Sequence, residues 1–159
     1  MQQGPQGESK PRGVLVMLRI IWGAMIIGLV LMGLVLSSRA GGPPDAAEAV
    51  IPNTRNTYAI VMYAMLLLAV PAGYFVRNQL YKSGWREHAV TPQAYFIGNI
   101  ILFSVLEGLT FSGFMLSVMV DLDPIVLIPG AIGFALLLLN FPTGKPMQPR
   151  EPRFGRLPS

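Results

Sequence analysis

Four long apolar runs, separated by short polar stretches, dominate the chain. They cover residues 14–36, 58–76, 94–120 and 124–141. A helix of about 20 apolar residues is long enough to cross the hydrocarbon core of a bilayer. In lipid, backbone groups must be satisfied inside a helix or a closed barrel, and unbroken apolar runs favour helices. The pattern therefore predicts an all-α fold, a four-helix transmembrane bundle.

Polar and turn residues mark where these helices should begin. Asn56 or Thr57 is placed to cap the second run. Thr91-Pro92 and Asp123-Pro124 each combine a capping residue with a first-turn proline, which is typical of a helix start. Residues 77–90 are polar, and we expect them to form a loop.

Composition supports a membrane location. Hydrophobic residues make up 52% of the chain and charged residues 13%, whereas a soluble domain carries roughly 25% charged residues. The polar segments 1–12 and 143–159 are expected to be disordered cytoplasmic tails around a transmembrane domain of residues 13–142. Ser38-Arg39-Ala40 resembles a signal peptidase site, but the apolar core before it exceeds the usual 7–15 residues, so an uncleaved span is expected.

The basic residues predict the orientation. In a four-span chain, ten of the twelve fall on one side and only Arg39 and Arg55 on the other. The ten are Lys10, Arg12, Arg19, Arg77, Lys82, Arg86, Lys145, Arg150, Arg153 and Arg156. The positive-inside rule places that side, with both termini, in the cytoplasm. We expect the protein to lie in the cell inner membrane. The expected partners are the lipid bilayer and other membrane subunits or further copies of the chain, and no nucleic acid is expected.

Glu107 carries a high free-energy cost of insertion into lipid, because it lies at the middle of the third apolar run. Helical spacing puts Ser104 and Thr110 one turn to either side of it, with Asn99 on a neighbouring face. One interpretation is a proton- or cation-binding carboxylate. The other is a protonated Glu that hydrogen-bonds a neighbouring helix and serves packing. A pair with Arg19 is a third alternative.

Small residues predict close helix packing. Ala24 and Gly28, like Ala69 and Gly73, are spaced four apart, and Gly113 lies on the third run. Such pairs allow two helix backbones to approach in a membrane.

Other chemistry is not indicated. The chain has no Cys and a single His, His88, which excludes disulfides and thiolate metal sites. Asp121 and Asp123 bracket a turn, and capping accounts for Asp123. We expect neither a metal, nor a cofactor, nor catalysis.

Residues 106–114, Leu-Glu-Gly-Leu-Thr-Phe-Ser-Gly-Phe, resemble the ion-binding helix of the proteolipid c subunits of rotary ATP synthases. Glu107 and Gly113 keep the offset of that family's carboxylate and glycine, and Arg77-Asn78-Gln79 is similar to its loop. The resemblance implies that Glu107 would carry an ion. The chain is also similar to uncharacterised small bacterial four-span proteins with a mid-helix Glu and a final span ending in Phe-Pro, which is the resemblance that we prefer. That group implies no particular function.

Overall fold

The computed structural model describes residues 11–39, 52–86, 88–120 and 122–148. Four α-helices make up most of it: α1 (Pro11–Arg39), α2 (Pro52–Ser83), α3 (Pro92–Val118) and α4 (Pro124–Leu139). A two-stranded antiparallel hairpin, β1 (Trp85–Arg86) and β2 (Ala89–Val90), joins α2 to α3, and a short 3-10 helix, η2 (Lys145–Met147), follows α4. The predicted all-α, four-helix fold is confirmed.

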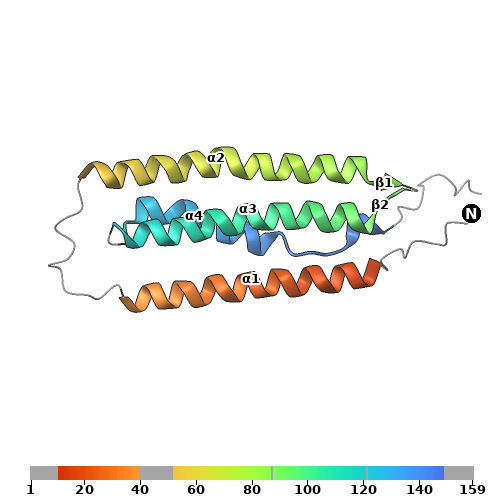
Figure 1. Cartoon of the computed structure of the whole chain (residues 1–159), viewed down its shortest axis with the longest axis horizontal. Helices are drawn as coiled ribbons and strands as arrows, with labels where there is room; N and C mark the ends of the chain where they lie inside the picture. The colour runs from red at the N-terminus through yellow and green to blue at the C-terminus, as the bar shows by residue number, and fades with distance from the viewer. Residues whose placement is uncertain (1–10, 40–51, 87, 121, 149–159) are drawn as a thin grey trace, which may run out of the picture.

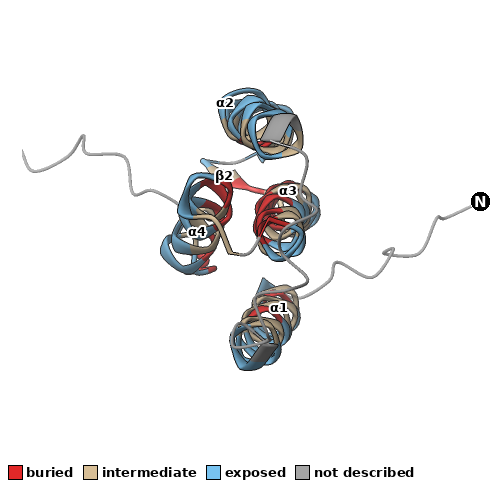
Figure 2. Cartoon of the chain, turned by 90° about the vertical axis from the view of Figure 1, so that its left-hand side faces the viewer, coloured by how far each residue is buried: buried red, intermediate tan, exposed pale blue. Residues whose placement is uncertain are grey.

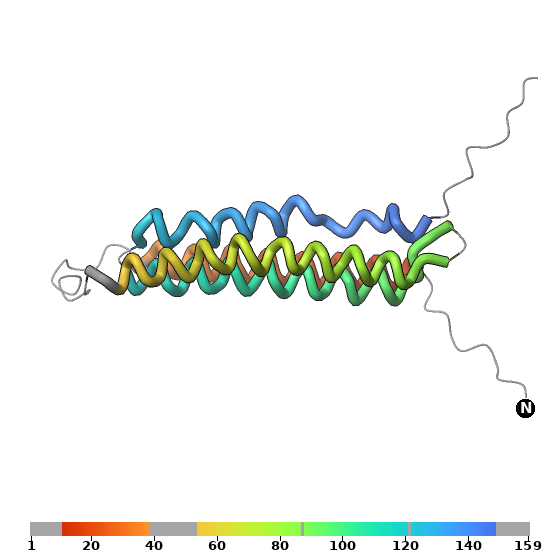
Figure 3. The backbone as a smooth tube through the Cα atoms, turned by 90° about the horizontal axis from the view of Figure 1, so that it is seen from above, coloured from red at the N-terminus to blue at the C-terminus, as the bar shows by residue number. Residues whose placement is uncertain are grey.

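The helix α3 is at the centre of the bundle. It lies between α1 and α2 in one layer, and α4 packs on one face of that layer (Figures 1 and 3). The side chains of Leu102, Phe103 and Leu106 on α3 are fully buried. Viewed end-on, the buried positions gather where α3 faces its neighbours, and the outer faces of the helices are exposed (Figure 2).

The exterior is apolar. Among the described residues, three helices are long and apolar enough to cross a membrane, within Pro11–Ser38, Thr54–Ser83 and Pro92–Val118. Ile60, Leu67 and Leu68 on α2 are each at least 70% exposed. Surface this apolar suits lipid rather than water, and the chain is a multi-pass membrane protein. The fourth helix has 16 residues, about 24 Å at the α-helical rise.

The helix α2 is longer at both ends than the predicted span 58–76. It begins at Pro52, so Asn56 and Thr57 lie inside the helix and do not cap its start. It continues past Arg77 to Ser83, and the predicted loop 77–90 is instead a helical end and a hairpin. The difference arises because an apolar run measures only the part of a helix inside hydrocarbon.

Two predicted helix starts are present. Thr91 precedes α3 with Pro92 in the first turn, although its side chain makes no capping hydrogen bond. The Asp123 carboxylate caps α4 by accepting a hydrogen bond from the Ile125 N–H at 2.8 Å, with Pro124 next to it.

The fourth helix ends earlier than predicted. Its last residue is Leu139 rather than Phe141, because Asn140 caps the end: its backbone N–H and its side-chain Nδ2 both donate to the Leu136 carbonyl. The following residues continue in the direction of α4 to the end of the bundle where α1 and α3 begin (Figures 1 and 3).

Part of each predicted tail is ordered. Pro11 and Arg12 belong to α1. Gly144 is buried at a φ of +76°, where a side chain would be strained, and its N–H donates to the Tyr95 hydroxyl at 3.0 Å. Segments 1–10 and 149–159 of the predicted tails lie outside the described residues. Residues 40–51, between α1 and α2, and Asp121 also lie outside them.

Candidate functional site

Glu107 lies halfway along α3 and is half-buried. No hydrogen bond or ion pair joins its side chain to any described part of the protein. Seven residues further along α3, the Phe114 ring touches the position of Gly33 on the parallel helix α1. Since seven residues span about 10 Å, Glu107 stands at roughly the depth of residues 24–28 of α1.

Two of the three polar residues predicted to accompany Glu107 make hydrogen bonds elsewhere, and the third is exposed. Thr110 is fully buried, donates to the Leu106 carbonyl at 2.8 Å, and faces α4 through Gly133. Ser104 is exposed. Asn99 is buried in a separate network near the start of α3, described below. The structure therefore does not bring these groups together around the carboxyl.

Arg19 does not pair with Glu107 either. Its Nε donates to the Pro142 carbonyl at 3.3 Å, and its guanidinium carbon lies 5.3 Å from the centre of the Phe141 ring. The residues that follow α4 therefore hold this charge near the start of α1.

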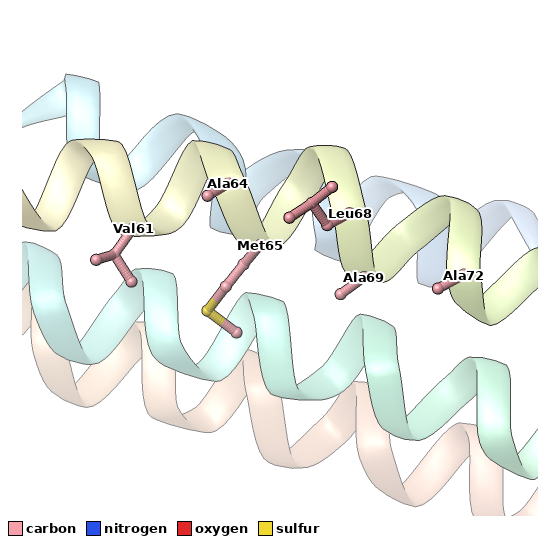
Figure 4. Close-up of a pocket in the computed structure, with 6 residues that line it drawn as sticks. All are labelled: Val61, Ala64, Met65, Leu68, Ala69 and Ala72. Carbon is pink, nitrogen blue, oxygen red and sulfur yellow. The ribbon is translucent and has the colours of Figure 1, made fainter.

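The small residues divide into two groups. Gly113 and Gly130 bring α3 and α4 into backbone contact, since a Cβ at Gly113 would lie 2.6 Å from the Gly130 Cα. Gly73 lets α2 approach α3, where a Cβ would meet Leu102 and Val105 at 3.4 to 3.5 Å. Ala69 is half-buried and lines an apolar groove along α2 (Figure 4), together with Val61, Ala64, Met65, Leu68 and Ala72.

The pair on α1 has a different environment. Ala24 and Gly28 are exposed, and among the described residues nothing lies within 4 Å of a Cβ built at Gly28. Among the described residues, α1 therefore packs on α3 through a different face from this pair, one that includes the buried Leu18 and Leu29.

A polar network, which sequence reasoning missed, joins α2 to the end of α4. Arg77 Nη1 donates to Asn140 Oδ1 at 3.0 Å, and Asn140 Nδ2 donates to the Tyr74 hydroxyl at 2.5 Å. The Arg77 guanidinium carbon lies 4.8 Å from the Tyr74 ring centre and 5.7 Å from that of Tyr81. Both distances suit cation–π attraction.

The same network continues onto α3. Asn99 Nδ2 donates to the Tyr81 hydroxyl and to the Tyr95 carbonyl, both at 2.7 Å. The Tyr81 and Tyr95 rings stack with centres 5.7 Å apart. Gly98 allows the Tyr81 ring of α2 to lie against the α3 backbone, because a Cβ at position 98 would lie 2.9 Å from that ring.

Trp22 on α1 contacts the same end of α4. Its indole N–H donates to the Leu137 carbonyl at 2.9 Å, and its ring meets the Phe141 ring edge-on at 5.1 Å. Carbonyls at the end of a helix lack intrahelical donors, so this bond satisfies one of the last carbonyls of α4.

Comparison of the chain with protein-family models, with curated proteins and with solved structures finds no match. The two resemblances thus stay predictions from short sequence motifs. Among the residues that the structure describes, no three His, Asp or Glu side chains gather where they could hold a metal ion.

The opposite end of the bundle carries an ion pair between Arg55 Nε and the Asp123 carboxylate. The hydrogen bond from the Ile125 N–H, and secondarily Arg55, hold the pKa of Asp123 below its ordinary value. This pair links α2 to the start of α4 and is a structural contact.

The missed network has a recognisable sequence signal. Tyr74, Arg77 and Tyr81 are three and four residues apart, and so are aligned on one face of a helix. Tyr95 and Asn99 are likewise four apart on α3. The signal is visible only if α2 is extended past residue 76.

Proposed function

We propose that this protein is a non-enzymatic subunit, or helix-packing partner, of a membrane assembly. The observation that carries the proposal is Glu107, a carboxyl near the bilayer centre that has no hydrogen-bond partner in the described chain. Lipid tails offer no donor or acceptor, and an unsatisfied polar group there is costly. A transmembrane segment of another subunit, or of a second copy, supplies the missing partner.

The exposed face of α1 supports the same proposal. Ala24 and Gly28 leave the α1 backbone open at roughly the depth of Glu107. Small residues spaced four apart allow another helix to approach closely, and polar side chains then hydrogen-bond across the contact. A helix seated there gains both the close approach and the carboxyl.

Ion movement is less well supported. Ion carriage needs ligands around the carboxyl, but Asn99 and Thr110 hydrogen-bond to other parts of the bundle and Ser104 is exposed. A packing role requires one hydrogen bond from the partner helix, which suits the isolated position of Glu107.

We also propose that the protein lies in a cell inner membrane with both termini in the cytoplasm. The starts of α1 and α3 and the end of α2 lie at one end of the bundle, and the residues after α4 continue to that same end (Figure 1). That end carries Arg12, Lys82, Arg86 and Lys145, which the positive-inside rule assigns to the cytoplasm.

Cross-linking in native membranes tests the assembly role. The chain has no Cys, so a single Cys introduced by Gly28→Cys is the only thiol on the protein. We expect it to form a discrete cross-linked species, whereas Leu34→Cys, at another exposed position of α1, forms less of it.

The same assay tests Glu107. Glu107→Gln should retain the cross-linked species, because an amide still donates and accepts, and Glu107→Leu should reduce it. Ser104→Leu, an exposed polar residue one turn away, is the matched control and should have no effect. A species unaffected by Glu107→Leu would refute the role. Loss of proton flux in vesicles on Glu107→Gln, with cross-linking intact, would favour ion movement instead.

A further inference from the structure

A small cavity lies between the end of α2, the start of α3 and the residues that follow α4. Its volume is about 180 Å³, and Arg77, Tyr81, Tyr95 and Asn99 supply its polar walls. Liquid water occupies about 30 Å³ per molecule. The cavity therefore has room for a tetrahedral oxyanion but not for a lipid molecule.

The cavity walls have more donors than the protein uses. A guanidinium has five N–H donors, and within the described chain Arg77 uses Nη1 in a hydrogen bond to Asn140. Its Nε is shielded from the surface and has no acceptor within the described part of the chain. Buried donors without acceptors are rare and call for an explanation.

The tyrosine hydroxyls add to the surplus. The Tyr81 hydroxyl accepts from Asn99, and the Tyr95 hydroxyl accepts from the Gly144 N–H. Each of them still has its own proton to donate, and neither donates to an acceptor in the described residues. The described lining contains no carboxylate to neutralise Arg77.

The position of the cavity matches a membrane surface. Arg77 lies six residues before the end of α2, about 9 Å along the helix. Exposed Lys82, Arg86 and Lys145 lie at the same end (Figure 1). Basic residues near a bilayer surface attract anionic headgroups.

We propose that this cavity binds a phosphate oxyanion, with the Arg77 guanidinium as its cationic ligand and the Tyr81 and Tyr95 hydroxyls as further donors. A guanidinium pairs with phosphate through two parallel hydrogen bonds, and Arg77 lines the cavity with N–H groups that the described chain leaves without an acceptor. The phosphodiester of an anionic phospholipid and inorganic phosphate both offer this chemistry.

Thermal unfolding of the full chain in mild detergent tests the proposal. Dioleoylphosphatidylglycerol, dioleoylglycerol and inorganic phosphate are titrated separately at constant ionic strength. We expect a saturable rise in Tm with a phosphate-bearing probe and none with dioleoylglycerol. A rise with the phospholipid identifies a headgroup as the source, and a rise with inorganic phosphate alone identifies free phosphate.

Variants separate binding from structure. Arg77→Gln should weaken the saturable response about tenfold or more, the usual worth of a hydrogen bond to a charged group. Arg55→Gln, which removes an arginine of α2 at the opposite end of the bundle, should leave it unchanged. If Arg77→Gln does not fold, Tyr81→Phe tests the same site and should also weaken the response.

A purely structural Arg77 would predict a different result. Arg77→Gln would then lower the starting Tm but keep the full response to each probe. That result, unchanged titrations of both Arg77→Gln and Tyr81→Phe, or no saturable response of the wild type to either phosphate-bearing probe, would overturn the proposal.

Discussion

The close contact between α3 and α4 allows a quantitative prediction for Gly113→Ala. A Cβ at this position would lie 2.6 Å from the Gly130 Cα and 2.9 Å from the Gly130 nitrogen. Carbon atoms in contact normally lie about 3.5–4.0 Å apart, so α4 would have to move by about 1 Å. The obstacle is backbone, which cannot rotate away as a side chain would.

Two opposing terms set the size of the effect. Overpacking a tight core costs about 1–3 kcal/mol. Replacing a helical Gly by Ala gains about 0.5–1 kcal/mol, because Ala loses less backbone entropy on folding. The packing term is larger, and we expect Gly113→Ala to lower the free energy of unfolding by about 1–2 kcal/mol.

Gly108→Ala is the matched control, because Gly108 is on the same helix and nothing described lies within 4 Å of its Cβ. Only the entropy term applies there, so stability should stay equal or rise slightly. Reversible unfolding in mixed detergent, followed by circular dichroism, measures both changes. Equal effects of the two substitutions would refute the backbone contact between α3 and α4.

Three further predictions test two other contacts and the orientation of the chain in the membrane. Because the folded-state pKa of Asp123 is lowered, its ionised form contributes stability above its ordinary pKa, and this stability is lost as pH falls through the lowered value. Asp123→Asn should flatten that acid-side loss in a pH series of Tm, and an unchanged profile would contradict the lowered pKa of Asp123. Trp22→Phe should cost about 1 kcal/mol, because the Leu137 carbonyl loses its donor; detergent unfolding measures this, and wild-type stability would show that the bond is dispensable. A green fluorescent protein fused after Ser159 should fluoresce and an alkaline phosphatase there should be inactive, whereas the reverse pattern would place the C-terminus outside.

Apolar run length predicted the helices but not the full extent of α2. The runs reflect hydrocarbon depth, and the polar residues Arg77–Ser83 predict a loop although they remain helical beyond that depth. Capping chemistry is local. The helix starts at Thr91-Pro92 and Asp123-Pro124 could therefore be predicted from two or three neighbouring residues.

The environment of the polar residues could not be predicted in the same way. Helical spacing relates Thr110 and Asn99 to Glu107 on one helix, but it does not say which face α4 or α2 covers. Thr110 faces α4, and Asn99 reaches Tyr81 of α2. The network around Arg77 depends on where α2 and α4 end, and both ends differ from the predicted ones.

The early end of α4 has a consequence for the surrounding bilayer. A 16-residue helix of about 24 Å borders lipid whose hydrocarbon core is about 30 Å thick, whereas α1, α2 and α3 exceed that thickness. The short helix therefore creates a hydrophobic mismatch on its own flank, where the membrane must thin or the chain must tilt, at a modest cost per ångström. A neighbouring protein seated at that flank would relieve the deformation by displacing the compressed lipids.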